Sequence, residues 1–237
     1  MNRQLSERLF AIASLVTPGF RLADVGCDHG LLSLYLLERQ TVPYAIGMDL
    51  REGPLSRARE NAVREHLGDR IEFRLSDGLD AYEAGEADSL VIAGMGGQMM
   101  KDILLREPEK TDSFQELILE PQKDPDRVRA ALRQLSFGIS AERMVKEQGK
   151  YYPVIRAARS APNASSGLGT RIDDYYGPLL LQNRDSVLGA FLDFREPAIR
   201  RILDGLTEEN GGKRRQFEQA LADIETIRRY FSCKCLS

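Results

Sequence analysis

The chain has 237 residues, a formal net charge of −3 and 42% hydrophobic residues, a composition that suits a globular protein with one sizeable core and a smaller appendage. It contains no apolar run long enough to span a membrane, and the segment from Met1 to Leu5 lacks the apolar core of a signal peptide, so we expect a cytoplasmic protein that has no membrane partner. The three cysteines, Cys27, Cys233 and Cys235, cannot all pair within the chain, and two histidines are few for a metal site. We therefore expect reduced thiols and no bound metal.

The charge is unevenly distributed along the chain. Residues 151–237 hold 13 Lys and Arg against 11 Asp and Glu, whereas the first 150 residues hold 20 against 25. The more basic C-terminal part is compatible with a polyanionic partner, although solvated helix faces are the more common explanation of such an asymmetry.

The first predicted elements surround a glycine-rich turn. Apolar residues at helical spacing predict a helix over residues 5–16, which ends at Pro18 and Gly19. A strand over residues 20–26 and a helix over residues 29–39 follow, joined by a tight turn with two glycines four apart. A nucleotide-type ligand binds over such a turn in many α/β proteins, but an ordinary strand-to-helix connection can have the same spacing.

The acidic residues of this turn indicate which nucleotide-type ligand fits. Asp28 occupies the position of the second glycine in the dinucleotide fingerprint, where its carboxylate would repel a pyrophosphate. S-adenosylmethionine has no phosphate, and its sulfonium and α-amino groups are suited to the carboxylates of Asp24 and Asp28. Gly26 lets the backbone approach the ligand closely.

Acidic residues also follow the next two predicted strands. The strand over residues 44–49 ends at Asp49, about 20 residues beyond the turn, a spacing typical of a carboxylate that binds ribose hydroxyls. The strand over residues 71–75 is followed by Asp77 and Gly78, where a carboxylate can accept the adenine amino group. An Asp-Gly turn that binds no ligand is the alternative at this position.

A second glycine-rich segment follows the fourth predicted strand, over residues 87–93. Gly94, Gly96 and Gly97 come directly after this strand, where repeated glycines indicate a close approach of the backbone to another group. Ligands bind at this edge of open α/β sheets, so we expect the substrate base to lie here. A fifth strand is predicted over residues 117–122, with its end marked by a proline that cannot donate within a central ladder.

The first domain is predicted to close with an antiparallel edge. A helix from Pro125 to Leu135 precedes a hairpin-like pair of strands that includes Ile139 and residues 144–157. Strands that alternate with helices, followed by an antiparallel end, indicate a doubly wound α/β sheet within residues 1–160.

The remainder of the chain predicts a separate helical domain. Small and polar residues at 160–170 indicate a linker. Helical stripes within residues 179–206 and 217–231, separated by a break at 210–212, predict an antiparallel hairpin in a domain over residues 171–237. Its many arginines suit the phosphates of a large RNA. A dimerising coiled coil is the alternative, so we expect a monomer or a homodimer.

Six motifs, taken in chain order, carry a resemblance to a known family. They are Asp24-Val25-Gly26-Cys27-Asp28-His29, Asp49 to Pro54, Asp77-Gly78-Leu79, Ile92 to Gly97, Gly149-Lys150-Tyr151-Tyr152 and Gly177-Pro178-Leu179-Leu180. Over about residues 5–180 the chain resembles the bacterial tRNA (adenine(22)-N1)-methyltransferase family. It departs from that family where Glu120-Pro121-Gln122 replaces the usual Gln-Pro-Asn, and where Gly30-Leu31-Leu32-Ser33 replaces an Ala-Tyr-Leu-Pro type of segment.

The resemblance implies a Rossmann-like class I methyltransferase sheet and methyl transfer from S-adenosylmethionine to N1 of an adenine in tRNA. Adenine N1 is nucleophilic in the neutral base, so positioning is the main catalytic task. Asp28 is the catalytic candidate, as the acceptor for the N6 amino group of the target adenine; a helix cap is its alternative role. Candidate donor-binding residues are Asp24, Gly26, Asp28, His29, Asp49, Asp77, Gly78 and Gly94, and candidate residues for the substrate base are Met95, Gly96, Gly97, Glu120, Pro121 and Gln122.

Three other functions remain open from the sequence. An NAD-dependent dehydrogenase would use the same sheet, but the carboxylate at the pyrophosphate position disfavours it. A non-catalytic RNA-binding protein that keeps the methyltransferase fold is compatible with the same motifs. A small-molecule methyltransferase also remains open, because a net acidic chain has no obligatory polyanionic partner.

Overall fold

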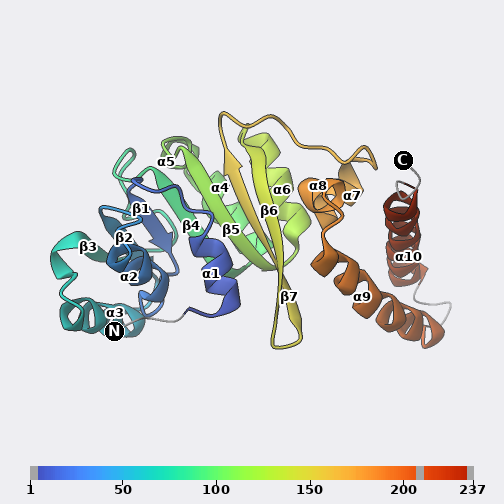
Figure 1. The fold of residues 1–237 in the computed structure, drawn as a ribbon, viewed down its shortest axis with the longest axis horizontal. Coiled ribbons are helices and arrows are strands. Elements are labelled where there is room, and N and C mark those ends of the chain that lie inside the picture. The colour runs from blue at the N-terminus through green and yellow to red at the C-terminus, as the bar shows by residue number, and fades with distance from the viewer. Residues whose placement is uncertain (1–4, 207–210, 234–237) are drawn as a thin grey trace. The chain divides into compact units, whose positions relative to one another are not determined.

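The structure is a computed structural model that describes residues 5–206 and 211–233 (Figure 1). The chain divides into two compact units, residues 1–164 and residues 165–237. Each unit is described by itself below.

The first unit is built on a seven-stranded sheet in the order β3-β2-β1-β4-β5-β7-β6. The first five strands are parallel, whereas β7 is antiparallel to both β5 and β6. This arrangement confirms the predicted Rossmann-like methyltransferase sheet and its antiparallel end. The strands are β1 (Leu22–Val25), β2 (Ala45–Asp49), β3 (Ile71–Leu75), β4 (Ser89–Gly96), β5 (Glu116–Lys123), β6 (Gly138–Glu147) and β7 (Lys150–Ala158).

Helices cover both faces of this sheet. Alternate residues of a strand point to opposite faces, so that in β4 Leu90 and Ile92 belong to one buried cluster and Val91 to the other. The first cluster includes residues of α4 and α6, and the second includes residues of α1, α2 and α3. The helices are α1 (Glu7–Ala13), α2 (Leu31–Glu38), α3 (Glu52–Arg64), α4 (Gly97–Arg106), α5 (Pro108–Asp112) and α6 (Pro125–Gln134), with a 3-10 turn η1 (Gly68–Arg70).

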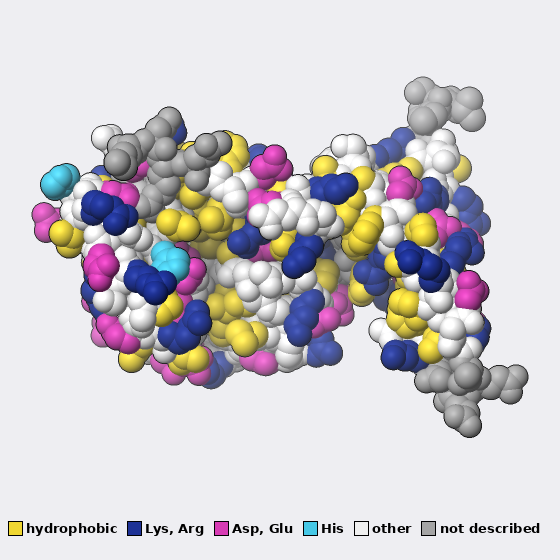
Figure 2. All heavy atoms as spheres, turned by 90° about the horizontal axis from the view of Figure 1, so that it is seen from below, with side chains coloured by type: hydrophobic (Ala, Val, Ile, Leu, Met, Phe, Trp, Pro, Cys, Tyr) yellow, Lys and Arg dark blue, Asp and Glu magenta, His cyan; other side chains and the backbone are white. Residues whose placement is uncertain are grey.

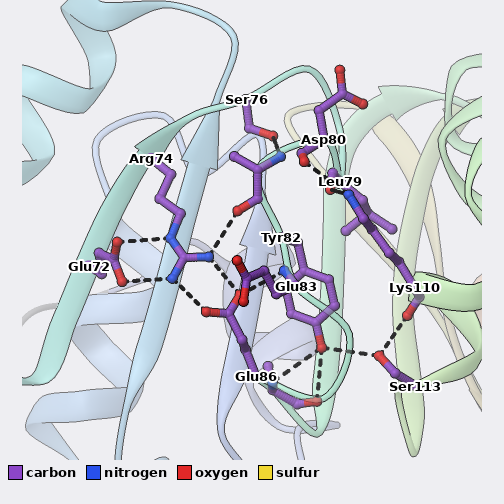
Figure 3. A network of polar contacts seen from close by, with 12 residues as sticks. Glu72, Arg74, Ser76, Leu79, Asp80, Tyr82, Glu83, Glu86, Lys110 and Ser113 are labelled. Carbon is purple, nitrogen blue, oxygen red and sulfur yellow. Dashed lines mark hydrogen bonds and ion pairs between the residues drawn. The ribbon is translucent and has the colours of Figure 1, made fainter.

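The connection from β3 to β4 is held by side chains rather than by regular secondary structure (Figure 3). The Arg74 guanidinium pairs with Glu72 and Glu86 at 2.8 and 2.6 Å and donates to the carbonyl of Ala81 at 2.9 Å. These hydrogen bonds lower the pKa of both glutamate carboxyls. The Ser76 hydroxyl accepts from the Ala81 N–H at 3.0 Å. The network therefore fixes the chain that follows β3, at the edge where ligands are expected.

Two predicted boundaries differ from the structure. Pro121 does not end β5, because the strand continues to Lys123. Pro121 pairs with Met95 between two register shifts of the β4–β5 ladder, and a proline is tolerated at such a bulge because no regular ladder bond is lost there. On the other strand β4 continues through Gly96, and Gly97 already begins α4.

The second unit consists of helices α7 (Thr170–Tyr176), α8 (Pro178–Gln182), α9 (Ser186–Asp204) and α10 (Gly211–Ser232). The predicted C-terminal helices are confirmed, but the first stripe is split. Arg184 has a positive φ of 48°, and the Asp185 carboxylate then caps α9 by accepting from the N–H groups of Val187 and Leu188. Asn210 lies outside the described residues.

Two contacts show that α9 and α10 are antiparallel. Near the end of α9 the Leu203 carbonyl accepts from Arg214 at 3.2 Å, whereas Asp193, earlier in α9, pairs with Arg228 at 2.7 Å. An ion pair from Arg171 in α7 to the buried Asp223 joins these helices to the start of the unit.

Candidate functional site

A cavity of about 590 Å³ lies at the carboxyl ends of the parallel strands. Its walls come from α1, from the segments that follow β1, β2 and β3, and from the β4–α4 region. The cavity is therefore at the edge where the sequence predicted a ligand. Figure 2 views the protein from the side toward which the β6–β7 hairpin points in Figure 1, and it shows Lys and Arg side chains in several groups.

The turn from β1 to α2 brings bare backbone to the cavity. Gly26, Asp28 and Gly30 all have positive φ angles, of 75°, 51° and 69°. A Cβ atom on Gly26 would lie 2.4 Å from the Met95 Cε atom. Any side chain at this position would therefore be strained in conformation and would push Met95 aside, which explains the requirement for glycine.

Asp49 is fixed at the end of β2 and is mostly buried. Its Oδ1 atom accepts from the Arg51 N–H at 2.9 Å, and its Oδ2 atom accepts from the Asp28 N–H at 3.3 Å. Asp49 is only 7% exposed, and it lines the cavity. It therefore links the ends of β1 and β2 in the place where a ribose ligand was predicted.

Asp24 is buried near the end of β1, and the pKa of its carboxyl is raised. Burial raises the pKa of its carboxyl to about 6, and the nearby charge of Asp49 adds to the rise, while the hydrogen bond from the Ser33 hydroxyl opposes it. That hydrogen bond is 2.6 Å long. A buried carboxylate that is costly to ionise is a suitable partner for a cationic ligand group, which would restore the charge balance.

Asp28 and His29 lie at the mouth of the cavity. The Asp28 side chain is 58% exposed, and its Oδ1 atom is 3.7 Å from the His29 Nε2 atom. The cap position of α2 is Gly30, and no side chain caps that helix, so the alternative role of Asp28 as a helix cap is not observed. The His29 Nδ1 atom is buried and has no hydrogen-bond partner among the described residues. Both side chains are available to a ligand.

Asp77 and Gly78 are not brought into this cavity. The Asp77 carboxylate is exposed and pairs with Arg106 at 3.1 Å, and a Cβ on Gly78 would meet Arg106 and Ile103. Ser76, one residue earlier, lines the cavity instead. The adenine-binding role of Asp77 and Gly78 therefore stays a prediction without a supporting contact.

The glycine-rich loop after β4 divides into two parts. Gly94, with a φ of 79°, and Met95 line the cavity. A Cβ on Gly96 would lie 2.8 Å from Lys123, and one on Gly97 would lie 2.1 Å from the backbone oxygen of Asp124. The requirement for glycine at the last two positions is therefore explained by packing, and their role in binding the base stays a prediction.

Glu120 is buried beside the cavity rather than in its wall. Its Oε2 atom accepts from Arg8 Nη1 at 2.7 Å and from the Gly94 N–H at 2.8 Å, and burial raises the pKa of its carboxyl. Pro121 and Gln122 are also absent from the lining residues of the described cavity. Binding of the substrate base by these three residues stays a prediction.

Several lining residues were missed by the sequence analysis. Arg8 lies in a helix for which only the apolar face was interpreted. Arg51, Ser76 and Met99 lie within two residues of predicted site residues, namely Asp49, Asp77 and Gly97. The only local signal was the proximity of Arg51 and Ser76 to the predicted strand ends. Nothing local indicated Arg8, because its partner Glu120 is 112 residues away in the sequence.

Three expected absences concern metal, disulfides and membranes. Within residues 5–206 and 211–233, no three His, Cys, Asp or Glu side chains are placed to share a metal ion. Cys27 is free and buried, Cys233 is free and exposed, and Cys235 lies outside the described residues. In the same part of the chain, none of the helices combines the length and apolar character that a bilayer crossing requires.

Comparisons with known proteins complete the description of the site. A family model described as a methyltransferase domain matches residues 5–155. The tRNA (adenine(22)-N(1))-methyltransferase of Bacillus subtilis is 30% identical over 185 residues, which cover 78% of each chain. The crystal structure of the Bacillus subtilis m1A22 tRNA methyltransferase has a TM-score of 0.86 at 27% identity, with 95% of this chain and 99% of that chain covered. A putative tRNA (m1A22) methyltransferase of Streptococcus pneumoniae, in complex with S-adenosyl-L-methionine, has a TM-score of 0.84 at 29% identity, with 94% and 99% covered.

Proposed function

The chain belongs to the tRNA (adenine(22)-N(1))-methyltransferase family, and on that basis we propose that it transfers a methyl group from S-adenosylmethionine to N1 of adenine 22 in tRNA. It is an S-adenosylmethionine-dependent methyltransferase. The observation that carries the proposal is the acid-lined cavity at the ends of β1, β2 and β4, in a chain that aligns with such an enzyme over 78% of its length.

The residues of the cavity fit this methyl donor. We assign the ribose hydroxyls to Asp49 and the cationic groups of the methionine part to Asp24, whose carboxylate gains most from a nearby positive charge. Gly26 and Gly94 offer bare backbone at positive φ to the ligand. When bound, S-adenosylmethionine supplies an electrophilic methyl group on a positively charged sulfur.

The protein has to place the target base rather than deprotonate it. N1 of neutral adenine carries an in-plane lone pair, which forms the new bond to the methyl carbon while the carbon–sulfur bond breaks, and the positive charge moves onto the ring. We assign the N6 amino group to the exposed Asp28 carboxylate at the cavity mouth. That hydrogen bond strengthens as the ring becomes cationic, so Asp28 stabilises the transition state more than the bound substrate.

The second unit is proposed to bind the body of the tRNA. Adenine N1 lies on the Watson–Crick edge, so the target must be unpaired or flipped out, and binding has to compensate for this distortion. Arg201 and Arg229 in α9 and α10 contact only backbone carbonyls among the described residues, which leaves their charges available to phosphates. The domain assigned to this role is the predicted one over residues 171–237.

The experiment that tests the proposal is a methyl-transfer assay with two tRNA transcripts that differ only at position 22. We expect N1-methyladenosine, mapped by mass spectrometry, at adenine 22 of the first transcript and no product with guanine at that position. The D28N variant should lower kcat by roughly a hundredfold, whereas D102N, an exposed change in α4, should not. Equal methylation of both transcripts, or transfer only to a small-molecule acceptor, would refute the proposed substrate.

A further inference from the structure

The motif Gly149-Lys150-Tyr151-Tyr152 carries part of the family resemblance, yet none of its residues lines the described cavity. In the structure this motif begins β7, directly after the turn from β6. Gln148 and Gly149 form a two-residue loop between the paired residues Glu147 and Lys150, and both have positive φ angles, of 48° and 76°. Positive φ at both loop residues is the geometry of a type I′ turn, whose twist matches that of the flanking strands. The β6–β7 hairpin therefore ends in a short and well-defined tip.

The hairpin extends beyond the rest of the sheet. The pairing of β7 with β5 ends at Ile155, and in the described part of the chain the residues from Val154 back to Lys150 pair with β6 alone. At about 3.4 Å per residue, positions 150–155 make this free ribbon about 17 Å long. Because β7 is antiparallel to β5, the ribbon extends from the edge where the parallel strands end, which is the edge of the cavity (Figure 1).

One face of the hairpin packs against the start of α1, which forms part of the cavity wall. The Glu147 carboxylate accepts from the Arg8 N–H at 3.1 Å, and the Arg8 guanidinium lies over the Tyr152 ring at 5.4 Å from the ring centre. This hydrogen bond is the largest of the contacts that lower the pKa of the Glu147 carboxyl. The acidic residue nearest the tip is therefore engaged by α1, and the hairpin is fixed beside the cavity.

The cations of the hairpin are exposed and lie on both of its faces. They are Arg143, Lys146 and Lys150, and none of them forms an ion pair with a carboxylate among the described residues. Paired residues of antiparallel strands point to the same face and successive residues to opposite faces. Lys150 therefore shares the face of its partner Glu147, whereas Lys146 lies on the other face, with its Nζ atom 5.4 Å from the centre of the Tyr151 ring.

This charge pattern fits the phosphate backbone of an RNA better than an acidic protein surface. A protein surface would meet the cations of one face only, whereas a nucleic-acid backbone can pass along both sides of a narrow ribbon. The major groove of a regular RNA helix is too narrow and deep to admit a ribbon. The hairpin therefore fits a place where the helix is interrupted, and an accessible adenine N1 imposes the same condition on the target.

We propose that the β6–β7 hairpin binds the tRNA backbone beside the target adenine, with Lys146 and Lys150 contacting phosphates on opposite sides of the ribbon. This inference rests on the proposed tRNA substrate and names a contact surface on the first unit. Two such contacts are too few to hold tRNA by themselves, so they add to those assigned to the second unit. They position the RNA strand at the cavity and carry no sequence information.

The test is a filter-binding assay of the full chain with a tRNA transcript over a series of KCl concentrations. Each phosphate contact contributes about 0.7–0.9 to the slope of log affinity against log salt. K146Q and K150Q should each lower the slope by that amount, which corresponds to roughly five- to eightfold weaker binding at 0.1 M salt. The double variant should lose about twice as much slope. The loss should be equal for transcripts with adenine and with guanine at position 22.

Two kinds of control accompany these variants. R57Q removes an exposed cation of α3, which follows β2, and should keep the wild-type slope. K146R and K150R keep the charge and should keep the slope as well. Affinity for S-adenosylhomocysteine, measured by calorimetry, should be unchanged in all of these variants, which shows that the fold and the cavity are intact.

Three results would overturn the inference. They are a wild-type slope in the double variant, an equal loss of slope in R57Q, and a loss of affinity confined to the transcript with adenine 22. If the wild-type chain neither binds nor methylates tRNA, the proposed function fails together with the inference. If the wild-type chain methylates tRNA and the double variant keeps its slope, the role of the hairpin alone fails.

Discussion

Asp24 is buried in the first unit, and the ionisation of its carboxyl affects both the stability of the fold and the proposed binding of the methyl donor. Its folded-state pKa is about 6, against an ordinary value of 3.8. The folded, ligand-free chain therefore keeps this proton at pH values where the unfolded chain has lost it. The contribution of Asp24 to the free energy of unfolding should therefore fall as pH rises from about 4 to about 6, by on the order of 3 kcal/mol once the carboxyl is ionised at neutral pH.

A cationic ligand reverses this preference, which gives a prediction for binding. Affinity for S-adenosylhomocysteine should rise as pH increases toward about 6 and then level off, since the ligand's amino group favours the ionised carboxylate. Calorimetry across pH 5 to 8 measures it, and D24N should remove this pH dependence. D102N, in which an exposed aspartate of α4 is changed, is the control and should behave as the wild type. An identical pH profile in D24N would contradict the assignment.

At the scale of elements, the junction of β4 and α4 depends on glycine for packing. A Cβ on Gly97 would lie 2.1 Å from the Asp124 oxygen, and backbone at this position cannot yield as a side chain can. G97A should therefore lower the free energy of unfolding by about 1–3 kcal/mol, as overpacked substitutions do. Thermal denaturation checks this. G53A in α3, where a Cβ meets nothing within 4 Å, is the control and should be neutral or slightly stabilising. Equal melting temperatures for the two variants would contradict this packing account.

How far the sequence predicted the site depends on whether each signal is local. The turn at Gly26 and Asp28 and the acid at Asp49 lie at strand ends, and a strand end followed by a glycine or an acid can be recognised from a few residues. Ser76 lines the cavity, whereas the neighbouring Asp77 pairs with Arg106, because neighbouring side chains at a strand end point to opposite sides. The adenine-binding role of Asp77 stays a prediction.

The long-range part of the site could not be predicted. Glu120 was predicted to bind the substrate base, which stays a prediction, and its buried contacts with Arg8 and Gly94 were not foreseen. That pairing exists only because α1 packs against the sheet near the end of β5, and no periodicity in either segment contains this information. The same holds for Pro121, whose place within a bulge depends on the partner strand.

At the scale of the whole molecule, we expect the first unit to bind the methyl donor and the second unit to bind tRNA. Both buried clusters of the first unit lie within residues 5–157, so a chain that lacks residues 171–237 should fold and keep its affinity for S-adenosylhomocysteine. It should lose measurable tRNA binding in a filter-binding assay. In the full chain, R201E combined with R229E should weaken tRNA binding and lower its salt dependence. Unchanged tRNA affinity in the truncated chain would refute the role of the second unit.

The account depends most on the identity of the ligand in the acid-lined cavity, and a calorimetric titration of the full chain with S-adenosylmethionine and, separately, with NADH measures this directly. We predict saturable binding of S-adenosylmethionine that is lost in D49A, and no binding of NADH, since Asp28 disfavours a pyrophosphate at the turn. No heat with S-adenosylmethionine, together with tight binding of NADH, would contradict the account.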